Sequence, residues 1–171
     1  SLTLPTPCNL RTIGKDTFSG NSLLTGKIDI PSSVETIGDG AFSGCRLITD
    51  VAVPSTVTRV GTGAFGGCTS LCTFYYDVAN NTAGKLFPSS EDYDPMTGGT
   101  IIMEHPFTLT LGPSVESLPN NFCWQGFVGT MDLSKATKLK SIGEYAFYQC
   151  SSLEGPNALA FGDALATVGS Y

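Results

Sequence analysis

Residues 28–45 of the chain read IDIPSSVETIGDGAFSGC, and residues 51–68 read VAVPSTVTRVGTGAFGGC. The second stretch follows the first at an offset of 23 residues, which is 51 minus 28. It repeats the proline, the step from Ile or Val to Gly, the Ala-Phe pair and the final cysteine. Coincidence cannot supply so many matches at one offset. A fixed period of this length predicts a repeat protein in which every copy forms one coil of a stack.

Looser copies of the pattern occupy most of the remaining sequence. One begins at Leu10 and contains Ile13-Gly14, and another runs through residues 139–153. Residues 109–119 are a degenerate copy, because Leu118-Pro119 replaces the Ile-Gly step, and residues 159–169 are a half-copy. We therefore expect about six coils, the last of them truncated.

Each recurring position has a physical reason. The alternation Ile28-x-Ile30 is typical of a short half-buried strand, and Pro31 ends it because proline cannot donate a ladder hydrogen bond. Glycine after the isoleucine suits a bend that needs positive φ or a close approach of two backbones. Ala41-Phe42 places one small and one large side chain in a layer of each coil, which predicts a spine of rings spaced roughly 5 Å apart.

The complete pattern, Leu-x-x-Ile-x-Ile-Pro-x-x-Val-x-x-Ile-Gly-x-x-Ala-Phe-x-x-Cys, resembles the BspA-like leucine-rich-repeat family, also called the Treponema-type repeat. The resemblance covers roughly residues 1–73 and 107–171. It implies a β-rich α/β solenoid, namely a right-handed superhelix with short parallel strands and a convex side of turns and short helices. It also implies a non-enzymatic module of an exported or surface-anchored protein that adheres to host or microbial surface or extracellular proteins. A structural spacer in a longer repeat array is the alternative.

The whole chain, residues 1–171, is expected to form a single leucine-rich-repeat domain with an interruption. Repeats occupy 1–73 and 107–171, whereas residues 74–106 contain neither an Ile-Gly nor an Ala-Phe step. One interpretation of this segment is a degenerate repeat with a lengthened loop whose aromatic side chains pack back on the solenoid. The other is a protruding recognition loop, because insertions in repeat proteins often lie on a binding face.

Composition excludes several classes of partner. The net charge is −6 with only nine Lys and Arg and no basic run, which argues against binding a nucleic-acid backbone. No apolar run approaches the length of a membrane span. The chain begins at Ser1 rather than Met, so we expect a processed or cloned fragment whose targeting segment has been removed. The family resemblance implies an extracellular or cell-surface location, and we expect no cofactor.

The six cysteines fit the repeat better than they fit a chemical site. Cys45, Cys68 and Cys150 share one repeat position, which Asn21 occupies in the first copy. Either residue type can be buried against turn backbone, so we expect reduced structural thiols, with a disulfide framework as the alternative. Cys68-x-x-x-Cys72 lacks the paired spacing of a zinc site.

No arrangement of residues predicts catalysis or a metal site. His105 is the only histidine, and its position between Glu104 and Pro106 suits a loop better than a triad. The acidic group Glu91, Asp92 and Asp94 lacks the spacing of a calcium-binding EF-hand loop, which favours a solvated loop.

Partner recognition is instead expected on outward strand positions and in the insertion. The candidate residues are Lys27, Asp29, Asp50, Thr108, Thr110, Thr130 and Asp132 on the strands, and Tyr75, Tyr76, Phe87 and Tyr93 in the insertion. The strand set, which Ala52 completes, is polar and mildly acidic, and it contains no aromatic anchor of the kind that dominates protein interfaces. An ordinary solvated sheet face is the alternative for these positions.

Overall fold

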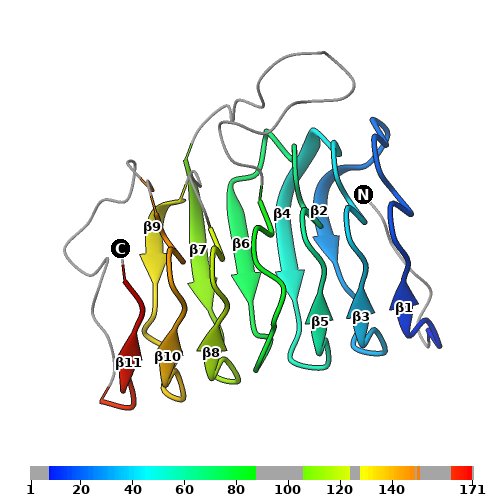
Figure 1. Cartoon of the computed structure of the whole chain (residues 1–171). Coiled ribbons are helices and arrows are strands. Elements are labelled where there is room, and N and C mark those ends of the chain that lie inside the picture. Colours follow the sequence, from blue (N-terminus) through cyan, green and yellow to red (C-terminus); the bar gives the residue numbers. More distant parts are fainter. Residues whose placement is uncertain (1–7, 88–105, 124–127, 149, 151–162, 171) are drawn as a thin grey trace.

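Short parallel strands stacked side by side make up the chain in the computed structural model (Figure 1), which describes residues 8–87, 106–123, 128–148, 150 and 163–170. The strands are β1 (Thr12–Ile13), β2 (Thr25–Asp29), β3 (Thr36–Ile37), β4 (Leu47–Val53), β5 (Arg59–Val60), β6 (Thr73–Tyr76), β7 (Phe107–Leu111), β8 (Ser117–Leu118), β9 (Val128–Asp132), β10 (Ser141–Ile142) and β11 (Thr167–Val168).

These strands form three parallel sheets. The largest has the order β2-β4-β6-β7-β9, and two smaller sheets have the orders β1-β3-β5 and β11-β10-β8. Each turn of the chain contributes one strand to the large sheet, so the molecule is a parallel β-solenoid of about five turns. The predicted solenoid with short parallel strands is therefore confirmed.

The predicted short helices of the convex side are wrong, because the described residues contain no helix. Tight turns take their place, as where the Ser43 amide donates to the Gly40 carbonyl (2.9 Å) and the Cys45 amide to the Phe42 carbonyl (3.2 Å). Gly40 has a φ of +61°, which is incompatible with a right-handed helix. In line with this, no helix in the described part of the chain is long and apolar enough to cross a membrane.

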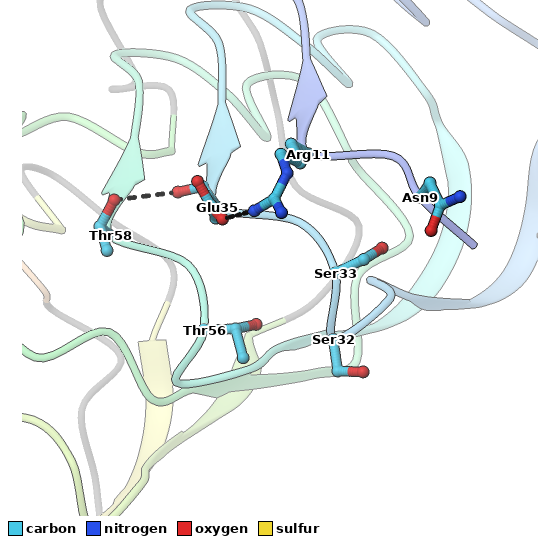
Figure 2. A pocket seen from close by; sticks show the side chains of 7 residues that line it. All are labelled: Asn9, Arg11, Ser32, Ser33, Glu35, Thr56 and Thr58. Atoms are coloured by element: carbon cyan, nitrogen blue, oxygen red, sulfur yellow. Dashed lines mark hydrogen bonds and ion pairs between the residues drawn. The ribbon is translucent and has the colours of Figure 1, made fainter. Parts of the chain in front are cut away.

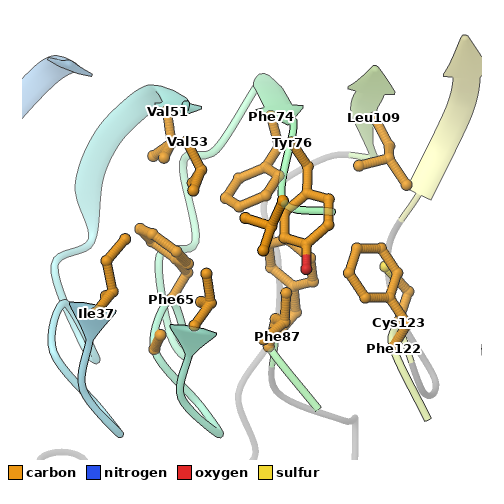
Figure 3. Close-up of a cluster of buried hydrophobic side chains, with 14 of the residues drawn as sticks. Ile37, Val51, Val53, Phe65, Phe74, Tyr76, Phe87, Leu109, Phe122 and Cys123 are labelled. Carbon is orange, nitrogen blue, oxygen red and sulfur yellow. The ribbon is translucent and has the colours of Figure 1, made fainter. Parts of the chain in front are cut away.

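Aromatic rings form the predicted spine in the first coils and then change their packing. The ring centroids of Phe18 and Phe42 are 5.2 Å apart, and those of Phe42 and Phe65 are 5.4 Å apart at an interplanar angle of 3°. Beyond Phe65 most of the contacts become edge-to-face, beginning with Phe74, whose centroid lies 5.1 Å from that of Phe65. Figure 3 shows this ring and Tyr76 pointing inward from β6. The core thus runs continuously past the place where the sequence pattern stops.

The recurring glycine after Ile or Val is required by close approach of neighbouring coils. A Cβ on Gly38 would lie 2.6 Å from the carbonyl carbon of Gly14, and one on Gly61 would lie 2.6 Å from that of Gly38. Positive φ occurs two positions later, at Gly40 and Gly63. The same left-handed conformation is adopted by Asp16, Lys85, Asn121 and Tyr145. Glycine is therefore needed at the first position because a side chain has no space there. At the second position glycine adopts the left-handed conformation most easily, but other residue types also adopt it.

Residues 73–87 form a coil of the solenoid, although they lie outside the predicted repeats. Strand β6 pairs with β4 on one side and β7 on the other. Lys85 then takes the left-handed position with a φ of 52°, and Phe87 is buried against Phe74, with centroids 4.8 Å apart. This part of the segment therefore fits the interpretation as a degenerate repeat. Residues 88–105 lie outside the described residues.

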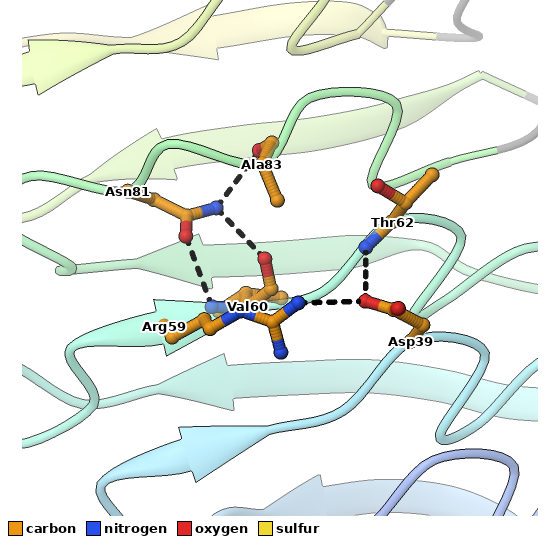
Figure 4. Close-up of polar contacts among 6 residues, drawn as sticks. All are labelled: Asp39, Arg59, Val60, Thr62, Asn81 and Ala83. Carbon is orange, nitrogen blue, oxygen red and sulfur yellow. Dashed lines mark hydrogen bonds and ion pairs between the residues drawn. The ribbon is translucent and has the colours of Figure 1, made fainter.

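The side chain of Asn81 bonds to the backbone of β5 at the junction of the two small sheets. It is 3% exposed, and its Oδ1 accepts a hydrogen bond from the Val60 amide at 3.0 Å (Figure 4). Its Nδ2 donates to the carbonyl oxygens of Val60 and Ala83, both at 3.0 Å. Neighbouring Asn80 forms an isolated parallel bridge with Ser117 of β8. The Asn81 side chain therefore takes the place of a strand between β5 and β8 and satisfies the backbone of β5.

The predicted cysteine position forms a ladder of thiol hydrogen bonds. The thiols of Cys45 and Cys68 donate to the carbonyl oxygens of Phe18 (3.0 Å) and Phe42 (3.4 Å), one coil earlier in each case. Cys150 donates in the same way to Cys123 at 3.2 Å. None of the six cysteines forms a disulfide with another described residue. The shared position thus fixes each turn to its neighbour through a thiol rather than through a disulfide.

Alkaline pH is expected to weaken the fold through these thiols. Burial raises the pKa of Cys45, Cys68 and Cys123. Above the pKa of an unfolded thiol, about 8.5, the unfolded chain therefore loses protons that the native state keeps, and stability falls as pH rises. Each such thiol contributes a slope of at most about 1.4 kcal/mol per pH unit. Urea unfolding between pH 8 and 9.5 should show this fall, with a smaller slope in Cys68→Ala; equal slopes would contradict the expectation.

Candidate partner-binding face

The outward side chains of the large sheet lie in two straight rows. The first row contains Lys27, Asp50, Thr73, Thr108 and Thr130, and the second contains Asp29, Ala52, Tyr75, Thr110 and Asp132. The residues between these positions, such as Val51, Phe74 and Leu109, are at most 2% exposed. This alternation arises because successive side chains of a strand point to opposite faces. All seven strand candidates predicted from the sequence therefore share one face, which we call the outward face.

The four aromatic candidates of the insertion do not stay together. Tyr75 is partly exposed at the centre of the outward face. Tyr76 and Phe87 lie in the core, where they are 0% and 3% exposed, and neither is placed to touch a partner. Tyr93 lies outside the described residues. One of the three described aromatic candidates is therefore available at the surface.

Tyr75 is held by a polar cluster at the end of its strand. Its hydroxyl donates a hydrogen bond to the carboxylate of Asp77, which is 7% exposed. That carboxylate also accepts from the Ser114 amide at 2.7 Å and from the Ser114 hydroxyl at 3.3 Å. Burial, the negative charge of Asp77 and the hydrogen bond together raise the pKa of the Tyr75 hydroxyl. The ring is therefore fixed at its polar end, and the hydroxyl stays protonated at neutral pH.

Gly112 makes room for this cluster. A Cβ at that position would overlap the Asp77 carboxylate and would lie 2.5 Å from the Tyr75 hydroxyl oxygen. Glycine is therefore required directly after β7 for Tyr75 to reach Asp77.

Two aspartates of the outward face, Asp50 and Asp132, have lowered pKa values. Hydrogen bonds from Thr49, at 2.6 Å, and from Thr73 lower the pKa of Asp50. Hydrogen bonds from the hydroxyl and amide of Ser134 lower the pKa of Asp132. Asp29 forms an exposed ion pair with Lys27, with 2.9 Å between Nζ and Oδ1. Three carboxylates and one ammonium therefore stand in the two rows, a net charge of −2.

Sequence reasoning missed the place of Thr73 and Tyr75 on this face. The stretch after Cys72 has Asp77 at the position of the repeat's proline and contains no Ile-Gly or Ala-Phe step, which favoured its interpretation as an insertion. A weaker signal was present, because Phe74 and Tyr76 follow Val51 and Val53 at the repeat's own offset of 23. Large aromatic residues stand at positions that β-branched residues fill in the earlier copies.

A separate hollow of about 540 Å³ lies beside the turns that follow Pro31 and Pro54 (Figure 2). It is lined by Asn9, Arg11, Ser32, Ser33, Glu35, Thr56 and Thr58. The Arg11 guanidinium is paired with the Glu35 carboxylate, and the Thr58 hydroxyl donates to the Glu35 carbonyl at 3.1 Å. The lining contains neither histidine nor cysteine, so it offers no nucleophile–base pair of the Ser-His or Cys-His kind.

Other chemical sites can be placed only in part. Within the described ranges, no three His, Cys, Asp or Glu side chains gather as a metal site would require. His105 and the acidic group of Glu91, Asp92 and Asp94 lie outside those ranges.

Comparison with known protein families identifies the same type of repeat that the sequence pattern predicts. The family described as the BspA type leucine rich repeat region matches residues 1–88 and 108–171, in six copies. The match extends to residue 88 and so includes the coil formed by residues 73–87. Domains built from leucine-rich repeats generally mediate protein–protein interactions through their extended surfaces. No curated protein matches the chain.

Three solved structures are similar to this chain. A leucine-rich-repeat protein of T. pallidum matches with 20% identity and a TM-score of 0.55, over 95% of this chain and 64% of that one. One from Bacteroides ovatus matches with 28% identity and a TM-score of 0.47, over 94% and 43%. A leucine rich cell surface protein from Faecalibacterium prausnitzii matches with 22% identity and a TM-score of 0.44, over 85% and 42%.

The chain thus spans less than two thirds of the length of each of these proteins. The likeness to the T. pallidum structure supports the solenoid fold. Because the family match covers most of the sequence, this chain belongs to the BspA-type leucine-rich-repeat family.

Proposed function

We propose that this chain is a non-enzymatic adhesion module of an exported surface protein and that it binds host or microbial extracellular proteins through its outward face. The observation that carries the proposal is the arrangement of the two rows. A flat face of five strands presents polar side chains with one aromatic ring, Tyr75, at its centre. Aromatic residues at the centre of a contact surface supply much of the binding energy in protein interfaces. The exported location rests on membership of the family.

A structural spacer within a longer array is the second candidate. Among the described residues, strand β11 pairs with β10 alone, and its Val168 is 60% exposed. An open edge of this kind is suited to pairing with a further coil. In that case the partner-binding residues would lie elsewhere.

Partner capture is expected to depend on the outward face. Thr110→Lys places a long charged side chain beside Tyr75, and Ser55→Lys places the same charge on the exposed turn that follows β4, outside the two rows of the outward face. The wild type and Ser55→Lys should both retain proteins from a mixture of extracellular proteins and mucins, whereas Thr110→Lys should retain at least roughly tenfold less.

Two outcomes would count against adhesion through this face. Equal capture by all three proteins would show that the partner binds elsewhere on the chain. Absence of capture by the wild type at micromolar concentration would favour the spacer. Labelling of intact producing cells with an antibody against the chain, without permeabilisation, tests the surface location separately.

A further inference from the structure

The second row of the outward face is symmetric about its aromatic residue. Its order is Asp29, Ala52, Tyr75, Thr110 and Asp132, so a small side chain flanks the ring on each side and a carboxylate stands at each end. Strands are spaced by about 4.8 Å, which places each end carboxylate roughly 10 Å from the position of the ring. Asp50 of the first row lies on the strand next to Tyr75 and adds a third carboxylate.

The aromatic ring of Tyr75 is held in a position where a partner can stack on its flat side. The hydrogen bond between its hydroxyl and Asp77 fixes the polar end of Tyr75, so little rotational entropy remains to be lost on binding. Its neighbours Ala52 and Thr110 are too short to cover it. A cation placed over a tyrosine ring is attracted by the electron density of that ring.

We propose that the outward face takes a short, extended, arginine-bearing segment of a partner protein. A central guanidinium stacks on Tyr75, and flanking guanidinium groups pair with Asp29 and Asp132. The net charge of −2 over the two rows and −6 over the chain complements such a segment. The proposal rests on the proposed function, since it names the chemistry of the partner that the same face binds.

The spacing fits an extended peptide that crosses the strands. In the polyproline II form of an extended chain, three residues make one full turn and span about 9 Å, so every third side chain points to the same side at close to two strand spacings. Arginines at every third residue therefore reach the ring and both end carboxylates together. Lys27 does not prevent this pairing, because its ion pair with Asp29 is exposed, with 62% and 65% of the two side chains accessible to solvent. Exposed ion pairs of this kind are weak and easily exchanged.

The test uses the whole chain and a synthetic peptide, Arg-Gly-Gly-Arg-Gly-Gly-Arg, blocked at both ends, with its Glu counterpart as a control. Binding is followed by titration calorimetry, and the contact surface by changes in amide chemical shifts. We expect the arginine peptide to bind and to shift the amides of β4, β6 and β7. Tyr75→Ala should weaken binding roughly tenfold, and Tyr75→Phe, which keeps the ring, by less than about threefold.

Matched charge variants separate this contact from general attraction to an acidic protein. Asp132→Asn should weaken binding about threefold, whereas Asp163→Asn, an exposed position outside the large sheet, should leave it unchanged. Thermal melting of each variant confirms that it is folded.

Several results would overturn the proposal: equal losses in the two Asp→Asn variants, undiminished binding by folded Tyr75→Ala, no binding of the peptide, or Tyr75-dependent binding of a neutral oligosaccharide instead. If these occur while Thr110→Lys still abolishes capture of extracellular proteins, the adhesion function stands and only the arginine chemistry fails. If Thr110→Lys captures normally, the proposed face itself is wrong.

Discussion

Replacing Asn81 with leucine is expected to lower the free energy of unfolding by about 3–5 kcal/mol. The two side chains have similar volumes, but leucine can make none of the three hydrogen bonds of the amide. The Val60 N–H, the Val60 carbonyl and the Ala83 carbonyl would all lose a partner beside a side chain that is 3% exposed. Each buried group left unsatisfied costs about 1–3 kcal/mol. Urea unfolding followed by circular dichroism measures the loss.

Asn80→Leu is the matched control for this substitution. Asn80 is exposed, and its side chain accepts an exposed hydrogen bond from the Ser117 hydroxyl at 2.8 Å and donates one to the Glu116 carboxylate. Its replacement should cost less than about 1 kcal/mol. Equal losses in the two variants would show that the hydrogen bonds of Asn81 to β5 do not stabilise the fold in the way described.

Gly61→Ala is expected to destabilise the fold by about 3 kcal/mol, at the upper end of the usual cost of overpacking. The added methyl group would lie 2.6 Å from the Gly38 carbonyl carbon and would overlap the Asp39 backbone nitrogen. Backbone atoms of a stacked coil cannot move aside as the end of a flexible side chain can. The neighbouring coils must therefore separate locally, which disturbs the packing of the spine. Thermal and urea unfolding measure the loss.

Gly63→Asn, only two residues away, is expected to cost less than about 1 kcal/mol. Gly63 has a φ of +62° and open space around its Cβ position, and Asn121 already adopts a φ of 57° at the same position of another coil. If Gly63→Asn were the more damaging change, backbone conformation and not close approach would explain the recurring glycine.

The repeat could be recognised in the sequence at positions where a neighbouring coil leaves space only for a small residue. Gly38, Gly61 and the paired Ala41-Phe42 recur because a neighbouring coil leaves no alternative, so the pattern itself revealed the stack. The short helices were predicted from the family resemblance. They are absent from the described residues because the left-handed position of each coil, as at Gly40, interrupts any helical turn.

The coil of residues 73–87 was harder to predict because it contributes no strand beside β5 of the small sheet. The side chain of Asn81 makes the hydrogen bonds that such a strand would make. No sequence pattern indicates that an asparagine amide will replace a strand, as Asn81 does beside Val60. Similarly, the strand alternation Phe74-x-Tyr76 was not recognised, because aromatic residues replace the β-branched residues of the other copies. As a result, Tyr75 was assigned to an insertion, and its position between Ala52 and Thr110 became clear only from the strand register.

Site-specific photo-cross-linking tests most directly whether the outward face binds the partner. A benzophenone amino acid placed at Thr110 lies beside Tyr75, and the same amino acid at Ser55 lies on the exposed turn that follows β4, outside the two rows of the outward face. Both proteins are exposed to the same extracellular protein mixture, irradiated, and analysed for covalent adducts. We predict a discrete adduct from position 110 and none from position 55. Adducts of equal yield from both positions, or an adduct from position 55 alone, would contradict partner binding at the outward face.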